Sequence, residues 1–180
     1  TKMVSELIDS AVMPGIQGGP LMHVIAAKAV SFDEVRKNDF SEYCNQIINN
    51  AKSLANKFIE LGYNVVTNGT DTHLVLIDLS SKNISGKKAE ETLQKCLITT
   101  NKNMVPYDKR SPLITSGIRL GTPALTSRGM KEEQMIFIAD LISSVLSDIN
   151  NEAVIQGVKK SVIELTNSYP LYKEILHEMS

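Results

Sequence analysis

The sequence has 180 residues, of which 42% are hydrophobic and 22% are charged, and its formal net charge is −1. This composition is typical of a folded chain with a buried core, and the intermixed acidic and basic residues exclude a basic surface for nucleic acid or lipid. No apolar run approaches the roughly 20 residues of a membrane span, and we expect no secretory leader, so the sequence predicts a cytoplasmic protein that binds no membrane.

The N-terminal part of the chain is predicted to be helical on both sides of a glycine-rich stretch. Residues 5–12 are typical of the end of a helix, and residues 13–20 follow with several Gly and Pro. Pro20 suits the first position of a helix, where its missing N–H is not needed. We expect this helix to continue to about Asn38 and to be buried, because residues 21–35 are apolar on most sides.

An amphipathic helix and two strands are predicted next. The helix has apolar residues every three to four positions and ends at Gly62; these residues are Phe40, Tyr43, Ile47, Ala51, Leu54 and Phe58. Residues 63–67 and 73–79 are short β-branched and aliphatic runs on either side of the turn residues 68–71, which predicts two strands.

The remaining elements are predicted to be three helices and two short strands. Ser85 can cap a helix whose inner face is Ala89, Leu93, Cys96 and Leu97. Strands are expected at residues 98–100 and 117–120. Two helices close the chain, separated at Asn150–Asn151 and ended by Tyr169–Pro170, with inner faces of Met135, Ile138, Ile142, Val145 and Ile149 and of Ile155, Val158, Val162 and Leu165. This order predicts an α/β or α+β domain, a small sheet covered by helices.

Two irregular stretches are candidates for a functional site, since loops of this composition often carry function. In the first, adjacent Gly18 and Gly19 before a helix could bring backbone N–H groups to an anion. No Walker or Rossmann fingerprint is present, so the spacing favours a sharp structural turn over a phosphate site.

The second stretch, residues 99–123, contains Arg119 among the small residues Ser116, Gly117, Gly121 and Thr122. Small neighbours would leave room for a ligand beside a guanidinium, which binds carboxylates or phosphates through two parallel hydrogen bonds. A structural ion pair is an equal alternative. For the polar triplet of residues 101–103, a solvated turn is favoured.

The cysteines and histidines are scattered along the sequence and do not form a candidate disulfide or metal site. Cys44 and Cys96 stand far apart, as do His23, His73 and His177, so we expect neither a disulfide framework nor a metal site. Both cysteines are predicted to be small buried residues.

Four strings together resemble the serine hydroxymethyltransferase family, in its order and at its spacings over essentially all of the chain. They are MPGIQGGPLMH at residues 13–23, GTDTHL at residues 69–74, NKN at residues 101–103 and TSGIRLGTP at residues 115–123. The resemblance implies a fold-type I enzyme that depends on pyridoxal 5'-phosphate. Such an enzyme transfers the hydroxymethyl carbon of serine to tetrahydrofolate, giving glycine and 5,10-methylenetetrahydrofolate.

The resemblance also implies roles for particular residues. Arg119 matches the arginine that binds the α-carboxylate of the amino acid substrate. Gly18 and Gly19 match the pair whose backbone reaches the cofactor phosphate of the neighbouring subunit in a homodimer. Asn103 matches an asparagine that contacts the pterin of the folate, and Ser111 lies in a loop that borders the folate pocket. The family often has phenylalanine at the position of Leu113, so packing on the folate side could differ here.

By the same resemblance, residues 1–32 correspond to the end of the large cofactor-binding domain and its connecting helix, and residues 33–180 to the C-terminal small domain. No lysine here has the Thr/His-rich setting of the Schiff-base lysine. We therefore expect no catalytic residue, no bound pyridoxal phosphate and no activity in these residues alone. Without the resemblance, a stand-alone amino-acid-binding module or a dimerisation module is the alternative.

Overall fold

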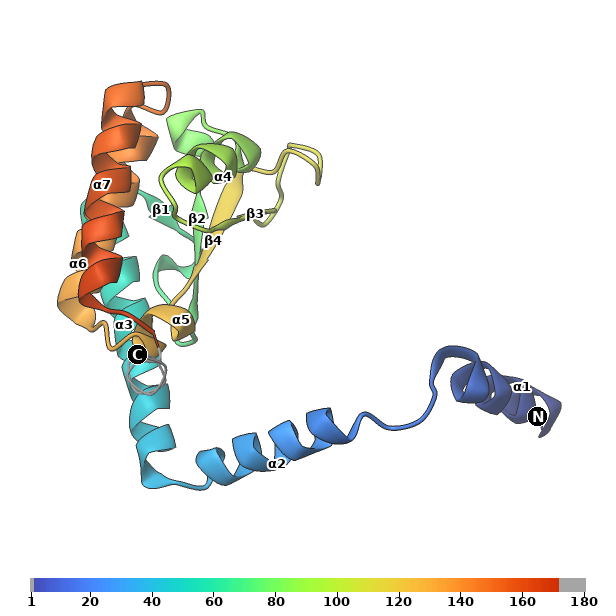
Figure 1. Cartoon of the computed structure of the whole chain (residues 1–180). Helices are drawn as coiled ribbons and strands as arrows, with labels where there is room; N and C mark the ends of the chain where they lie inside the picture. The colour runs from blue at the N-terminus through green and yellow to red at the C-terminus, as the bar shows by residue number, and fades with distance from the viewer. Residues whose placement is uncertain (1, 172–180) are drawn as a thin grey trace. The chain divides into compact units, whose positions relative to one another are not determined.

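The computed structural model describes residues 2–171, which divide into two compact units between Ser41 and Glu42. In the first unit, helix α1 (Lys2–Ser10) continues into the π-helical turn η1 (Ala11–Ile16), and helix α2 (Met22–Val35) follows after an extended segment (Figure 1). Helix α2 begins two residues later than predicted, with Met22 rather than Pro20 at its first position and Leu21 at its N-cap.

The prediction that α2 is buried is wrong for this chain. No residue of α2 is buried, and Phe32 is 67% exposed. The physical reason is that apolar residues surround this helix on most sides, while no described residue covers them. The apolar side chains of α1, such as Leu7 at 64%, are exposed in the same way.

Helix α3 (Asn38–Glu60) confirms the predicted amphipathic helix. Ala51, Leu54, Ala55 and Phe58 are buried on one face of this helix. Gly62 has a φ of +76°, a left-handed conformation that glycine adopts without steric cost, so the helix ends there.

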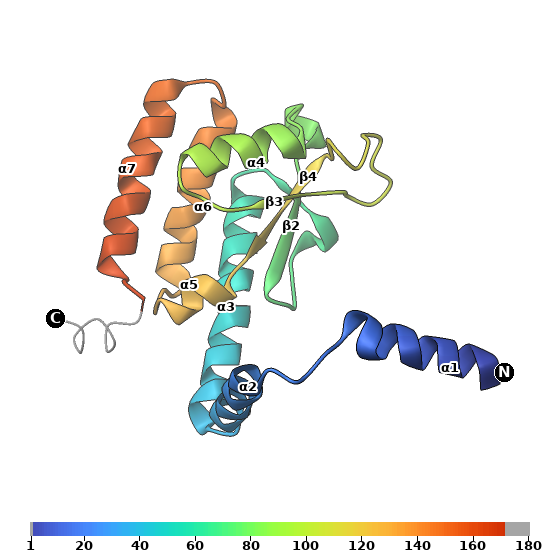
Figure 2. The same cartoon turned by 45° about the vertical axis from the view of Figure 1, so that its right-hand side comes forward.

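The second unit contains a four-stranded antiparallel sheet with the order β1-β2-β4-β3 (Figure 2). Its strands are β1 (Asn64–Val65), β2 (Leu74–Asp78), β3 (Asn101–Asn103) and β4 (Gly117–Gly121). The first predicted strand is shortened by a turn, η2 (Val66–Asn68), in which Thr67 has a φ of +63°.

The strand predicted at residues 98–100 lies at Asn101–Asn103 instead, so the solvated turn favoured for this triplet is wrong. Leu97 has a φ of +63° and the chain turns there after α4, so it enters the sheet only at Asn101. For the same reason Leu97 leaves the inner face of α4 predicted for it and is 55% exposed.

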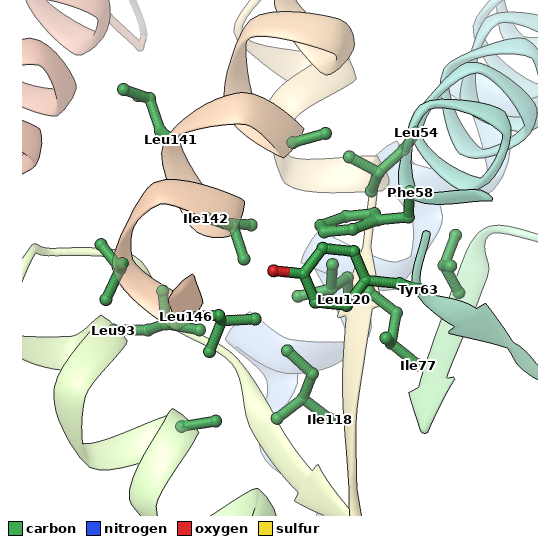
Figure 3. Close-up of a cluster of buried hydrophobic side chains, with 14 of the residues drawn as sticks. Leu54, Phe58, Tyr63, Ile77, Leu93, Ile118, Leu120, Leu141, Ile142 and Leu146 are labelled. Carbon is green, nitrogen blue, oxygen red and sulfur yellow. The ribbon is translucent and has the colours of Figure 1, made fainter. Parts of the chain in front are cut away.

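The helices of this unit cover one face of the sheet and enclose the core. Besides α3, these are α4 (Gly86–Lys95), α5 (Pro123–Ser127), α6 (Glu132–Ser147) and α7 (Glu152–Ser168), together with the turn η3 (Ser80–Lys82). Side chains of alternate strand residues, Ile77, Ile118 and Leu120 among them, point toward those of the helices (Figure 3). Phe58 and Tyr63 pack edge to face with ring centroids 5.4 Å apart.

The predicted cap at Ser85, the predicted break at Asn150–Asn151 and the predicted helix end at Tyr169 are confirmed. Ser85 Oγ accepts a hydrogen bond from Lys88 N, and Asn151 Oδ1 accepts from Ala153 N and Val154 N, so both residues satisfy N–H groups that a helix leaves unpaired. Cys96 is buried as expected, whereas Cys44 is half-buried, and neither forms a disulfide. Within the described part of the chain, no helix is long and apolar enough to cross a membrane.

Candidate functional site

The face of the sheet opposite the core carries two of the residues singled out in the sequence, Arg119 and Asn103. Side chains alternate between the two faces of a strand, and β4 follows this rule, since Ile118 and Leu120 are buried and Arg119 is exposed. Arg119 is the middle residue of β4, with Leu76 of β2 opposite it on one side and Asn101 of β3 on the other. Arg119 therefore projects from the centre of this open face.

Asn103 lies on the same open face as Arg119. It pairs with Gly117 across β3 and β4, two residues along β4 from Arg119. Diagonal neighbours of this kind are about 7–8 Å apart. The structure thus brings together Arg119 and Asn103, two of the five residues for which the resemblance implied a role.

Arg119 has no acidic partner among residues 2–171: no ion pair within 4.0 Å involves it. Asp78 shares the open face, but its carboxylate accepts hydrogen bonds from Asn64 Nδ2 and Ser80 N. The structural ion pair considered for Arg119 is therefore absent from the described residues, and the guanidinium can bind an external anion.

Two of the small residues next to Arg119 are explained by close packing and hydrogen bonding, and not by space for a ligand. Gly117 has no room for a side chain, because a Cβ would lie 2.7 Å from Val105 Cγ1 and 2.9 Å from the Ile77 carbonyl oxygen. Ser116 is buried and its hydroxyl binds Asp108. Close packing thus explains these two small residues, and the expectation that they leave room for a ligand was wrong at both positions.

The segment between β3 and β4, residues 104–116, is organised by Asp108. Its Oδ1 accepts hydrogen bonds from Ser116 Oγ at 2.6 Å and Arg110 N at 2.9 Å, and its Oδ2 accepts from Ser116 N at 2.8 Å and Val105 N at 3.3 Å. Partial burial raises the pKa of this carboxyl, but the bonds from Ser116, Arg110 and Val105 outweigh burial and lower the pKa to about 2.

Sequence reasoning did not identify Asp108. Aspartate commonly accepts from nearby backbone N–H groups in loops, which is the one signal the sequence offers. The partner that matters most, Ser116, is eight residues away, so only the folded loop shows the pairing. Asp108 also lines a pocket of about 330 Å³ with Asp78, Ser80 and Arg110 among others.

Ser111 lies at the exposed tip of this segment. Its carbonyl accepts from Ile114 N and Thr115 N, both at 2.9 Å, so it begins a tight turn. Leu113, within that turn, is 77% exposed. Ser111 and Leu113 are therefore both accessible from solvent.

Gly18 and Gly19 lie in the other unit, in the extended segment before α2. A Cβ at either position would meet no atom within 4 Å, and no hydrogen bond from their N–H groups is formed with the backbone of the described residues. Helix α2 also begins without a side-chain cap. These unpaired donors at a helix N-terminus fit the chemistry of a phosphate group.

The histidines do not combine with other residues into a metal site. Among the residues that the structure describes, no three His, Cys, Asp or Glu residues are close enough to hold a metal ion. His177 lies outside the described residues.

A sequence model of the serine hydroxymethyltransferase family matches residues 1–142. The chain belongs to the serine hydroxymethyltransferase family. The match includes the whole sheet and the open face, and it ends within α6. The resemblance found in the four strings is thereby confirmed, and a mixed α/β domain with a small antiparallel sheet is the fold expected from it. Serine hydroxymethyltransferases are pyridoxal-phosphate-dependent transferases of one-carbon metabolism that act on serine, glycine and folates.

Proposed function

We propose that this chain is the C-terminal part of a serine hydroxymethyltransferase and that Arg119 binds the α-carboxylate of serine or glycine. The observation that supports this role is the exposed guanidinium at the centre of the open sheet face, with no acidic partner among the described residues. Residues 1–32 would complete the large domain of the enzyme, and residues 33–180 would form its small domain.

In the complete enzyme, pyridoxal phosphate supplies the electron sink for the chemistry, and the protein supplies orientation and charge. A planar guanidinium can form two parallel hydrogen bonds with a carboxylate, which fixes the direction of the bond to the α-carbon. Arg119 would therefore select which substituent of the α-carbon is positioned to react, an effect of orientation rather than of proton transfer.

Gly18 and Gly19 would contribute backbone N–H groups to the cofactor phosphate of a neighbouring subunit, which implies a homodimer. Their unpaired N–H groups before the uncapped helix α2 support this assignment. Asn103 would contact the pterin of tetrahydrofolate, and Ser111 would border the same pocket. The common sheet face of Asn103 and Arg119 supports adjacent sites for the two substrates.

We also propose that residues 1–180 alone have no transferase activity, because none of their lysines has the sequence setting of the cofactor lysine. Incubation of this chain with pyridoxal phosphate, borohydride reduction and peptide mapping test the point. We expect diffuse, substoichiometric labelling, with the full-length enzyme as the positive control. One stoichiometrically labelled lysine would contradict the proposal.

The same preparation tests the alternative of a stand-alone amino-acid sensor. Calorimetry with serine and glycine should show negligible binding to residues 1–180, because the rest of the amino acid site belongs to the complete enzyme. Tight binding abolished by Arg119→Ala would instead support a sensor. A stable dimer that is indifferent to all of these ligands would support a dimerisation module.

A further inference from the structure

One peptide group connects Asp108 to Asn103. The N–H of Val105 donates to Asp108 Oδ2 at 3.3 Å, and the carbonyl of Met104, in the same peptide group, accepts from Asn103 Nδ2 at 2.7 Å. A trans peptide is planar, with its N–H and C=O pointing in opposite directions. A carboxylate that fixes the N–H therefore also fixes the carbonyl on the other side.

Asp108 is itself anchored to the sheet. It accepts from both the backbone N–H and the hydroxyl of Ser116, the residue directly before β4. The carbonyl of Ser116 accepts from Leu79 N at 2.8 Å, which extends the pairing of β2 with β4 beyond the strands. The direction of the Met104–Val105 peptide is thus set by the sheet and not by the exposed part of the loop.

The Asn103 side chain receives its orientation from that carbonyl. Because Nδ2 donates to the Met104 carbonyl, the plane of the amide is set, and its Oδ1 accepts no hydrogen bond from the described residues. An amide held in this way presents an acceptor and a second N–H donor in a fixed direction. Such a pair suits a flat heterocycle whose edge alternates donors and acceptors.

We propose that Asp108 is a positioning residue for the folate substrate and that it orients the amide of Asn103 through the Met104–Val105 peptide. The inference rests on the proposed role of Asn103 at the pterin. In this proposal Asp108 contacts neither substrate, and it affects the affinity for tetrahydrofolate but not the affinity for serine.

A double-mutant cycle in the full-length enzyme tests the inference. Asp108→Asn has the same shape, but one of its two acceptor oxygens becomes an NH₂ group that cannot accept from a backbone N–H. We expect Asp108→Asn to raise the KM for tetrahydrofolate roughly fivefold to tenfold and to leave the KM for serine within about twofold, in line with couplings inside one hydrogen-bond network. In the Asn103→Ala background, Asp108→Asn should raise the KM for tetrahydrofolate no further.

These KM values distinguish a positioning role of Asp108 from a general contribution of Asp108 to folding. An equal effect of Asp108→Asn in both backgrounds, or a parallel rise of the KM for serine and for tetrahydrofolate, overturns the inference while the role of Asn103 stands. An unchanged KM for tetrahydrofolate in Asn103→Ala alone removes that proposed role and the inference with it.

Two further variants complete the design. Asp140→Asn removes a partly exposed ion pair with Lys57 on another part of the unit and should leave both KM values unchanged. If Asp108→Asn does not fold, Ser116→Ala removes only the 2.6 Å bond from the hydroxyl. It should give a smaller rise in the KM for tetrahydrofolate that also disappears in the Asn103→Ala background, and persistence of the rise there would overturn the inference.

Discussion

Asn101 and Arg119 are direct partners across β3 and β4, so an uncharged amide lies beside the guanidinium where a carboxylate would have neutralised it. On the other side of Arg119, the partner in β2 is Leu76. Residues that face each other across antiparallel strands have their Cβ atoms about 5 Å apart, close enough for an acidic side chain at position 101 to form an ion pair with the guanidinium. Among the described residues, the register of the sheet thus leaves the positive charge of Arg119 without an acidic partner, which favours an anionic ligand there.

Replacement of Arg119 should weaken serine binding in the full-length enzyme. Loss of a hydrogen-bonded charge pair costs about 2–4 kcal/mol, so Arg119→Ala should raise the KM for serine roughly 30-fold or more. Arg119→Lys should be nearly as severe, because lysine has no planar fork. Steady-state kinetics at saturating tetrahydrofolate measure this effect.

The matched control is Arg128→Lys. Arg128 donates to the Tyr169 carbonyl at 2.9 Å and so joins the end of α5 to the end of α7. Its replacement should lower the melting temperature without changing the KM for serine. Unchanged serine kinetics in Arg119→Lys would eliminate the two-bond contact with the carboxylate.

Periodic apolar residues made most of the fold predictable. The inner faces of α3, α6 and α7 follow from spacing alone, because a helix packs one stripe of residues against the core. Strand positions were less predictable where a single residue in the left-handed region redirects the chain, as Leu97 does before β3. Such a conformation at leucine depends on tertiary packing and has no local signal.

The residues of the candidate site were only partly predictable from the sequence. Arg119 could be singled out because a charge interrupts an apolar strand, but its lack of an acidic partner depends on the register of three strands. Asp108 could not be found, since its role depends on a turn that brings residues 105 and 116 to one carboxylate. The sequence predicted a buried α2 because this helix is apolar on most sides. Hydropathy indicates that an apolar surface is covered, but it does not identify the residues that cover it.

Stability should depend on pH through Asp108. Its folded pKa of about 2 lies below the ordinary value of 3.8, so folding favours the ionised form. The stabilisation is therefore complete above about pH 4 and is lost as the pH falls toward about 2. Urea denaturation of wild type and Asp108→Asn should show a difference in unfolding free energy that is largest near neutral pH and shrinks across this window.

Asp140→Asn serves as the reference for the pH series, because Asp140 forms a surface pair with Lys57. Its effect should stay within about 1 kcal/mol. Asp78, Lys109 and Arg110 line the same pocket as Asp108 and are left intact in both variants. A constant difference between wild type and Asp108→Asn down to about pH 2 would contradict the assignment of this acid-sensitive stability to Asp108.

Asn50, a polar residue on the buried side of α3, should contribute to the free energy of unfolding. It is fully buried, and its Nδ2 donates to Thr126 Oγ1 at 2.9 Å and to the Met130 carbonyl at 3.0 Å. Asn50→Leu would remove the donor to both oxygens and the acceptor for Gln46 Nε2, and the loss of buried hydrogen bonds of this kind costs about 1–3 kcal/mol. Thermal unfolding should show the loss, whereas Asn49→Leu, at an exposed position of the same helix, should have little effect.

Three glycines allow a comparison of steric and conformational effects on stability. A Cβ at Gly117 would lie 2.7 Å from Val105 Cγ1 and 2.9 Å from the Ile77 carbonyl oxygen, and a Cβ at Gly86 would overlap Thr115 Oγ1 and the Gly117 carbonyl. Alanine at either position should therefore destabilise the protein by about 1–3 kcal/mol.

Gly157→Ala is the matched control, since Gly157 lies inside α7 and a Cβ added there would meet no atom within 4 Å. Alanine there should stabilise the protein by about 0.5–1 kcal/mol, because glycine loses more chain entropy in a helix. Urea denaturation of the three variants measures these opposite signs. Tolerance of Gly117→Ala together with Gly86→Ala would contradict the close packing of residues 104–116 against β4, and destabilisation by Gly157→Ala would contradict the free space around that position in α7.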